Sequence, residues 1–210
     1  MGLGAYILFA FSSLFVIVEP LGAVPAFLAM TPQDTPAERI RMARMACWIA
    51  GAVLIFFALT GMAIFKLLGI TLPAFQIAGS FVLLFIAHDM LRARRSPVNE
   101  TLEEKEVGAA KEDIAITPLG VPMLAGPGAI TTTILLNNRA SGALQVGSLY
   151  LCIIGVCVLS YVILRLSAQG ARWMGPIAMK ITTRLMGLLL AAVAVQFVLN
   201  ALKDLKVLVF

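Results

Sequence analysis

The sequence Glu19-Pro20-Leu21-Gly22-Ala23-Val24-Pro25 interrupts a long apolar segment that otherwise has the composition of a membrane helix. A second interruption, Thr117-Pro118-Leu119-Gly120-Val121-Pro122, continues to Ala125-Gly126-Pro127-Gly128. Proline has no amide proton and its ring clashes with the preceding turn, so both segments predict a break in a helix. Irregular backbone is tolerated in hydrocarbon only against protein or along a cavity. A matched pair of such breaks in the two halves of one chain is typical of a transporter binding site.

The rest of the chain is apolar enough to lie in a membrane. Hydrophobic residues make up 60% of the 210 residues, charged residues make up 13%, and the mean hydropathy is +0.97. Uncharged stretches of roughly 20 residues, the length that crosses about 30 Å of hydrocarbon as a helix, recur along the chain. We therefore predict an all-α membrane protein with six transmembrane helices, at residues 3–30, 45–66, 72–91, 114–137, 143–165 and 183–203.

Basic residues are distributed unevenly between the connections of these predicted helices. Of the 16 lysines and arginines, most follow the first, third and fifth helices: Arg39, Arg41, Arg44, Arg92, Arg94, Arg95, Lys105, Lys111, Arg165, Arg172, Lys180 and Arg184. Because Lys and Arg gather on the cytoplasmic side, we predict a multi-pass protein of the inner (plasma) membrane with both termini outside the cytoplasm. The net charge of +5 then indicates orientation. We expect the basic residues to contact anionic lipid on the cytoplasmic side, and we expect no nucleic-acid partner.

An acidic stretch without apolar periodicity, residues 96–113, separates two sets of three predicted helices. We predict a cytoplasmic linker there, with one three-helix repeat at residues 1–95 and a second at 114–210. Since three is an odd number, the second set enters the membrane from the opposite side, and the two sets are predicted to be inverted repeats with broken first and fourth helices.

Two recurrences in the sequence support such a repeat. Pro20-Leu21-Gly22 recurs as Pro118-Leu119-Gly120, and Gly79 has a counterpart in Gly187. In inverted repeats of transporters the substrate lies near the middle of the bilayer, where the repeats meet. The sequence leaves open whether the broken helices cross the membrane fully or fold back as hairpins.

The second interruption predicts a site made of backbone amides and hydroxyls. Three prolines and three glycines lie between Pro118 and Gly128, and a helix is expected to restart near Gly128 or Ala129. The start of that helix presents unpaired amides and the positive end of its dipole, which suit a carboxylate. Thr131 and Thr132 would add hydroxyls. The predicted substrate-binding residues of both interruptions are Glu19, Pro20, Gly22, Pro25, Thr117, Pro118, Gly120, Gly126, Pro127, Gly128, Thr131 and Thr132.

Glu19 is the only ionisable side chain between the N-terminus and Asp34. A charged carboxylate at the middle of a span costs roughly 2.5–3.5 kcal/mol on insertion scales, so it is expected to face a cavity or a partner. One interpretation makes Glu19 a contact for a substrate ammonium group or the group that couples transport to a proton. The other makes it a structural cap for the helix that restarts after it, or a group in a water-filled vestibule that binds nothing.

Other classes of protein have little support in the sequence. Cys47, Cys152 and Cys157 fall inside predicted helices and indicate packing rather than a disulfide framework or a metal site. The chain has one histidine and no Gly-x-Ser-x-Gly motif, so we do not expect an enzyme, and no cofactor is expected beyond a coupling proton or sodium ion.

At residues 15–31, 117–130 and 184–197 the chain resembles the MarC family of bacterial and archaeal inner-membrane proteins, within the LysE-like transporter superfamily. The Ala125-Gly126-Pro127-Gly128 element is the most specific part of this resemblance. It implies six spans, an outward N-terminus and a duplicated three-span unit. Many relatives have aspartate or asparagine at the position of Glu19, so this chain departs from the family pattern there.

Some members of this family are similar to transporters of small neutral amino acids. The resemblance therefore implies that this chain is a secondary transporter of small zwitterions such as alanine and glycine, with ion coupling. The direction of transport and the oligomeric state stay open, with a homo-oligomer as one option. A scaffold or stress-response protein without transport activity is the main alternative, and it predicts breaks that are tightly packed with no cavity between them. An intramembrane enzyme is the weaker alternative.

Overall fold

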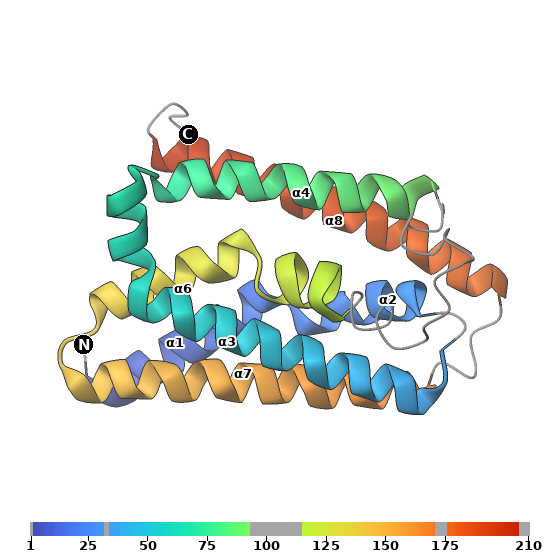
Figure 1. Ribbon diagram of the computed structural model, residues 1–210, viewed down its shortest axis with the longest axis horizontal. Helices are drawn as coiled ribbons and strands as arrows, with labels where there is room; N and C mark the ends of the chain where they lie inside the picture. The colour runs from blue at the N-terminus through green and yellow to red at the C-terminus, as the bar shows by residue number, and fades with distance from the viewer. Residues whose placement is uncertain (1, 32–33, 93–114, 171–175, 206–210) are drawn as a thin grey trace.

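The computed structural model describes residues 2–31, 34–92, 115–170 and 176–205, and every regular element in these ranges is a helix (Figure 1). The first half of the chain contains α1 (Leu3–Val18), α2 (Pro20–Met30), α3 (Pro36–Leu68) and α4 (Leu72–Arg92). The second half contains η2, a π-helix (Ala115–Leu124), α6 (Pro127–Arg139), α7 (Ala143–Gly170) and α8 (Pro176–Asp204). The predicted linker at 96–113 lies outside the described residues.

Five helical segments among the described residues are long and apolar enough to cross a membrane: Leu3–Met30, Pro36–Leu68, Leu72–Arg92, Ala143–Gln169 and Arg184–Asp204. The pair Pro118–Leu124 and Pro127–Arg139, which is bent by 52°, is either a sixth, broken span or a re-entrant segment. The prediction of an all-α membrane protein is therefore confirmed, with five or six candidate spans among the described residues. We call α1–α2 the first broken helix and η2–α6 the second broken helix.

The start of α3 lies nine residues before the predicted start of the second span, at Pro36 rather than residue 45. Thr35 and Glu38 form a capping box there, in which the Thr35 hydroxyl accepts from the Glu38 amide at 3.3 Å and the Glu38 carboxylate accepts from the Thr35 amide at 2.8 Å. Because this box satisfies amides that a helix start leaves unpaired, the helix extends past the apolar segment into its basic flank.

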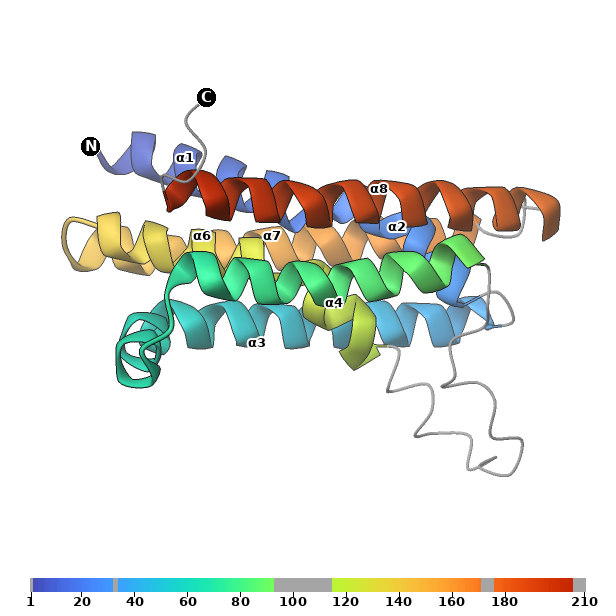
Figure 2. The ribbon, with the colours of Figure 1, turned by 90° about the horizontal axis from the view of Figure 1, so that it is seen from above.

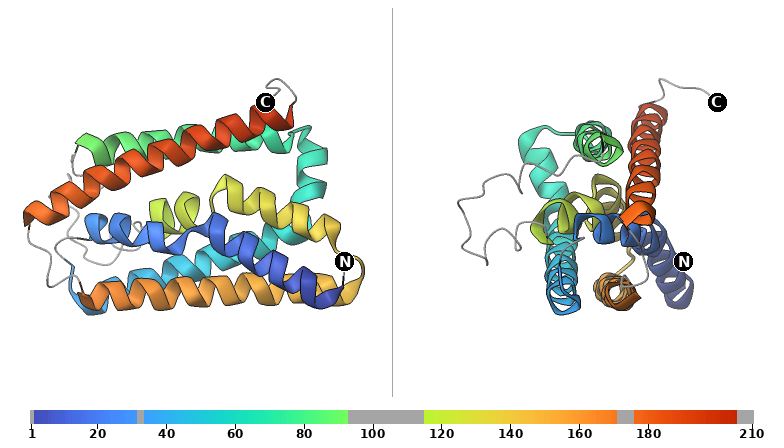
Figure 3. Two further views of the ribbon diagram at one scale, coloured as in Figure 1. Left: turned by 180° about the vertical axis from the view of Figure 1, so that it is seen from behind. Right: turned by 90° about the vertical axis from the view of Figure 1, so that its right-hand side faces the viewer.

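The helices form three layers, as the view along the molecule in Figure 3 shows. The last helices of the two halves, α4 and α8, pack on each other and form one outer layer. The helices α3 and α7 pack on each other and form the other outer layer. The broken helices lie between these layers, and they contact both of them and each other. The middle layer is thus where each break meets side chains from both halves of the chain.

Exchange of the two halves reproduces most of these contacts. The packing of α1 on α7 corresponds to that of η2 on α3, and the packing of α2 on α8 corresponds to that of α6 on α4. This is the pairing that an inverted repeat predicts, although the repeat itself stays a prediction. Gly79 and Gly187 do not have equivalent contacts, because Gly79 packs against Pro127 of α6 and Gly187 packs against the backbone of α4 at Ala87 and Leu91.

The start of α1 and the end of α8 lie at the same end of the molecule (Figures 1 and 2). The start of α3, with Arg39, Arg41 and Arg44, lies at the opposite end together with Arg92 at the end of α4. Helix order therefore separates the basic residues as the sequence predicts. Which end faces the cytoplasm stays a prediction.

Candidate functional site

The first broken helix breaks at one residue. Glu19 has a left-handed backbone, with φ 50° and ψ 53°, and it both ends α1 and begins α2. Its amide donates to the Phe15 carbonyl at 3.1 Å, and its carbonyl accepts from the Ala23 amide at 3.1 Å. Pro20 follows at the first position of α2, where a missing amide proton costs little. The bend is small enough that Leu3–Met30 counts as one candidate span by length and composition, rather than as a bent pair of helices.

The second broken helix changes direction over a longer segment. Pro118 and Pro122 lie inside the π-helix η2, whose end is closed by a bond from the Ala125 amide to the Gly120 carbonyl at 2.9 Å. Gly126 then has an extended backbone and caps α6, and no side chain caps that helix start. A Cβ on Gly126 would lie 2.5 Å from the Pro122 carbonyl oxygen, so only glycine fits this turn.

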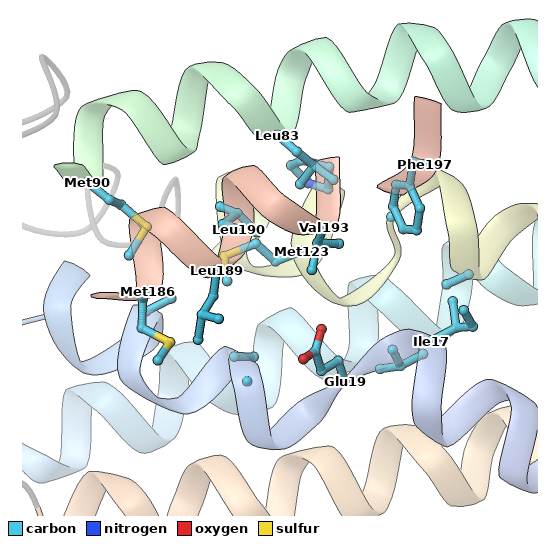
Figure 4. A pocket seen from close by; sticks show the side chains of 17 residues that line it. Ile17, Glu19, Leu83, Met90, Met123, Met186, Leu189, Leu190, Val193 and Phe197 are labelled. Carbon is cyan, nitrogen blue, oxygen red and sulfur yellow. The ribbon is translucent and has the colours of Figure 1, made fainter. Parts of the chain in front are cut away.

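One cavity of about 70 Å³ joins the two breaks (Figure 4). Its volume is several times the roughly 10–15 Å³ that a water molecule needs. The first broken helix contributes Glu19 and Gly22, and the second contributes Pro122, Gly126 and Ala129. The outer layer closes the opposite side with α4 and α8. Its lining residues from α4 and α8 are Leu83, Met90, Met186, Leu189, Leu190, Val193 and Phe197.

Among the described residues that line the cavity, Glu19 has the only ionisable side chain. Its carboxylate points into the space below α8 in Figure 4. Within the described part of the chain, that carboxylate has no hydrogen-bond or salt-bridge partner, and it makes no capping bond at the start of α2. The Cγ, Cδ and Oε1 atoms of Glu19 each lie 3.0 Å from the position that a Cβ on Gly22 would take. Gly22 thus leaves the space in which the carboxylate lies over the first turn of α2.

The start of α6 brings hydrogen-bond donors to the same cavity. The first helical bond runs from the Ile130 amide to the Gly126 carbonyl at 2.9 Å, so the amides of Gly128 and Ala129 precede the helical pattern. Such first-turn amides carry the positive end of the helix dipole and favour an anion. A carboxylate on one side and uncapped amides on the other suit a ligand with an ammonium group and a carboxylate.

The other predicted site residues lie away from the cavity wall. Pro20 is buried at the start of α2, Pro25 is half-buried within α2, and Pro118 and Gly120 belong to η2. The side chain of Thr117 lies outside what the structure describes. Pro127 packs against Gly79 of α4, and Gly128 lies under the ring of Phe197. The structure thus brings Glu19, Gly22 and Gly126 together and places the others behind them.

The threonines of α6 do not line the cavity either. Thr132 is half-buried, and Thr131 is 3% exposed with an Oγ1 atom that has no hydrogen-bond partner among the described residues. The Oε1 atom of Gln76 in α4 is likewise buried without a partner. Gln76 precedes Gly79 by one turn and Thr131 follows Pro127 by one turn, so both polar atoms belong to the region where α4 packs on α6.

Among the lining residues that sequence reasoning missed, α8 contributes more than any other helix. The five lining residues of this helix lie about one turn apart, except for the adjacent Leu189 and Leu190, and form one face: Met186, Leu189, Leu190, Val193 and Phe197. Other apolar residues occupy the remaining faces of α8, as is usual for a helix whose outer faces meet lipid. Hydrophobic periodicity therefore carried no signal for this face, and only the fold identifies it.

Comparison with known proteins identifies the chain. A family model described as MarC family integral membrane protein matches residues 4–206. A UPF0056 membrane protein of Methanocaldococcus jannaschii is 38% identical over 203 residues, which cover 94% of this chain and 96% of that protein. YvbG of Bacillus subtilis, also a UPF0056 membrane protein, is 37% identical over 201 residues, which cover 95% of each chain. YhcE of Escherichia coli is 29% identical over 194 residues, which cover 92% of this chain and 90% of that protein. No solved structure matches the chain.

Proposed function

The chain belongs to the MarC family of integral membrane proteins, and we propose that it is a secondary transporter of small neutral amino acids or similar zwitterions. The observation that carries this proposal is the shared cavity between the two broken helices. Broken helices that meet at a cavity are the usual architecture of substrate sites in secondary transporters. Membership of the broader LysE-like superfamily stays a prediction.

The two walls of the cavity supply opposite charges to a zwitterion. The carboxylate of Glu19 would accept the substrate ammonium group, and the first-turn amides of α6 at Gly128 and Ala129 would bind the substrate carboxylate. The remaining wall is apolar, so a small uncharged side chain would fit there. Recognition therefore depends on one side chain and on backbone, without the threonine hydroxyls expected from the sequence.

Glu19 is also the candidate for coupling to an ion. An unpaired carboxylate in a membrane-spanning segment carries an insertion cost of roughly 2.5–3.5 kcal/mol, which protonation or a bound cation removes. Transport coupled to a proton or to sodium would then depend on whether Glu19 is neutralised during the cycle. The structural interpretation also stays open, because Glu19 is the N-cap residue of α2, although its side chain makes no capping hydrogen bond.

The layers suggest how access would alternate. The α4–α8 layer covers the cavity on one side, and the α3–α7 layer supports the broken helices on the other. We place the protein in the inner membrane with both termini outward, with two inverted three-helix repeats joined by the acidic linker. Rocking of the outer layer against the rest would then open the cavity to each side in turn.

Transport into liposomes tests the proposal. Purified protein would be reconstituted, and the movement of radiolabelled alanine, glycine and serine would be measured with and without a proton gradient. We expect saturable uptake, exchange or efflux of at least one of them. Absence of all three kinds of movement for every substrate would overturn the substrate assignment.

A substitution of Glu19 tests its role in coupling transport to an ion. Glu19→Gln keeps the size of the side chain and removes its charge, so we expect gradient-driven transport to be lost while exchange remains. Asp204→Asn, an exposed carboxylate at the end of α8, serves as the matched control and should behave as the unmodified protein. Unaltered driven transport in Glu19→Gln would exclude the coupling role.

The scaffold alternative predicts breaks that are packed without a cavity. The shared cavity with an unpaired carboxylate in its wall favours the transporter over that alternative. A scaffold would also tolerate Glu19→Gln without any change in the movement of solutes.

A further inference from the structure

A phenyl ring covers the start of α6. The Cζ and Cε1 atoms of Phe197 lie 2.6 and 2.8 Å from the position that a Cβ on Gly128 would take, and Cγ2 of Ile17 lies 3.4 Å from it. Gly128 is the second residue of α6, in the turn whose amides have no helical acceptor. The ring therefore lies directly on the backbone that presents those amides.

Phe197 reaches this position from a different layer. It belongs to α8, which packs mainly on α4 and α2, while α6 packs on α3, α1 and α4. In Figure 4 the side chain of Phe197 points from α8 toward the connection that leads into α6. A rotation of the side chain or a shift of the α4–α8 layer would take the ring off Gly128 without any change in α6.

The residue that follows Gly128 belongs to the cavity wall. Ala129 lines the cavity and is only 2% exposed. With the ring in place, the anion-binding end of the cavity is covered, whereas the Glu19 end is exposed. The two ends of the site thus differ in access in this structure.

We propose that Phe197 is a specificity-determining gate, whose ring must leave Gly128 before the anionic group of a ligand can reach the α6 amides. This inference rests on the proposed function, in which that group is the carboxylate of a zwitterion. For a ligand that binds only the open form, the apparent dissociation constant is the intrinsic one divided by the fraction of protein that is open. Removal of the ring therefore increases the apparent affinity and admits zwitterions with larger side chains.

The gate is tested by thiol labelling, which requires no transport. Ala129→Cys would be introduced after replacement of Cys47, Cys152 and Cys157 by alanine, and its reaction with a small charged methanethiosulfonate reagent would be timed. If the ring is on Gly128 about nine-tenths of the time, Phe197→Ala should raise the rate by up to roughly tenfold. Phe85→Ala, an exposed phenylalanine on α4, is the matched control and should leave the rate unchanged.

The outcomes separate the gate from the transporter. An equal labelling rate with Phe197 and with Phe197→Ala overturns the gate and leaves the transport proposal standing. A raised rate in a protein that moves none of the amino acids supports the gate as a cover of the cavity and overturns the transport proposal instead.

A second pair of variants tests the contact itself. Gly128→Ala should lower the melting temperature because its methyl group meets the ring tip, and Phe197→Leu, which has no atom at that position, should restore it in the double variant. Contacting residues depart from additivity in this way. Additive effects of Gly128→Ala and Phe197→Leu would show that the ring does not lie on Gly128, and would overturn the gate.

Discussion

The two broken helices differ in how the helix is interrupted and in which polar groups they bring to the cavity. The first breaks at Glu19 alone, keeps its direction well enough to pass as a single span, and brings a charged side chain to the cavity. The second passes through a π-helix, bends by 52° and brings only backbone and apolar side chains. Polarity in the membrane is thus carried by a side chain at one break and by peptide groups at the other.

This difference determines which substitutions each break tolerates. The neighbour of Gly22 is the flexible end of the Glu19 side chain, whereas the neighbour of Gly126 is the carbonyl oxygen of Pro122. A side chain can rotate away from a new methyl group, but a peptide group moves only if the turn moves. The first break should therefore be adjustable and the second rigid.

The largest expected effect is on Gly126. Gly126→Ala places a methyl group 2.5 Å from the Pro122 carbonyl oxygen, so we expect a loss of about 2–3 kcal/mol of stability, seen as a lower melting temperature in detergent. Gly22→Ala is the matched variant at the first break. It should cost less than about 1 kcal/mol, because the higher helix propensity of alanine offsets the shift of Glu19.

The same pair also separates stability from function. Gly22→Ala should lower the transport rate in liposomes, since the carboxylate is displaced from its place over α2. Equal melting temperatures for Gly126→Ala and Gly22→Ala would contradict the contrast between a rigid and an adjustable break.

Substitutions that remove a hydrogen bond at the end of each broken helix should reduce stability by a smaller amount. The guanidinium group of Arg39, which is 6% exposed, donates to the Thr31 carbonyl at the end of α2 from Nε at 2.9 Å and from Nη2 at 2.5 Å. Near the end of α6, the Tyr6 hydroxyl donates to the Leu136 carbonyl at 2.9 Å. Charged hydrogen bonds contribute more than neutral ones, so Arg39→Ala should cost about 2 kcal/mol and Tyr6→Phe about 1 kcal/mol of unfolding free energy.

Thermal or chemical unfolding in detergent measures both values. Arg44→Ala, an exposed arginine on the same helix as Arg39, is the control and should change stability by less than about 0.5 kcal/mol. An Arg39→Ala variant as stable as Arg44→Ala would mean that the bond to Thr31 contributes nothing to the end of α2.

The smallest effect concerns the backbone of Glu19 itself. A left-handed conformation costs a residue with a side chain roughly 1–2 kcal/mol, and glycine avoids that cost. Glu19→Gly should therefore be about 1 kcal/mol more stable than Glu19→Ala, although both lose the carboxylate and should lose driven transport. Identical melting temperatures would show that the backbone at this break stores no strain.

Much of this fold was predictable from local patterns. Five predicted spans agree with helices of the structure to within a few residues at one end or both, because apolar runs of that length have few alternatives in a membrane. The early start of α3 was missed, although Thr35 and Glu38 stand at the spacing of a capping box and could have indicated it. Pro and Gly located both breaks, but they did not distinguish the gentle break at Glu19 from the bent one at Gly126.

The candidate site was predictable only in part. Glu19, Gly22 and Gly126 line the cavity as expected of site residues, while Thr131 and Thr132 do not. Position along the chain placed these threonines near the break, but the face of α6 on which each one lies depends on how α6 packs against its neighbours. The direct binding roles of all these residues stay predictions.

Properties that belong to single residues and short segments could be read along the chain: the apolar length of each span, the proline and glycine breaks, and the isolated carboxylate of Glu19. The packing of distant helices decided the rest. It placed both breaks at one cavity, turned one face of α8 toward them and laid Phe197 on Gly128. The physical reason is that a helix surrounded by lipid can be apolar on every side, so its composition does not record which side meets protein.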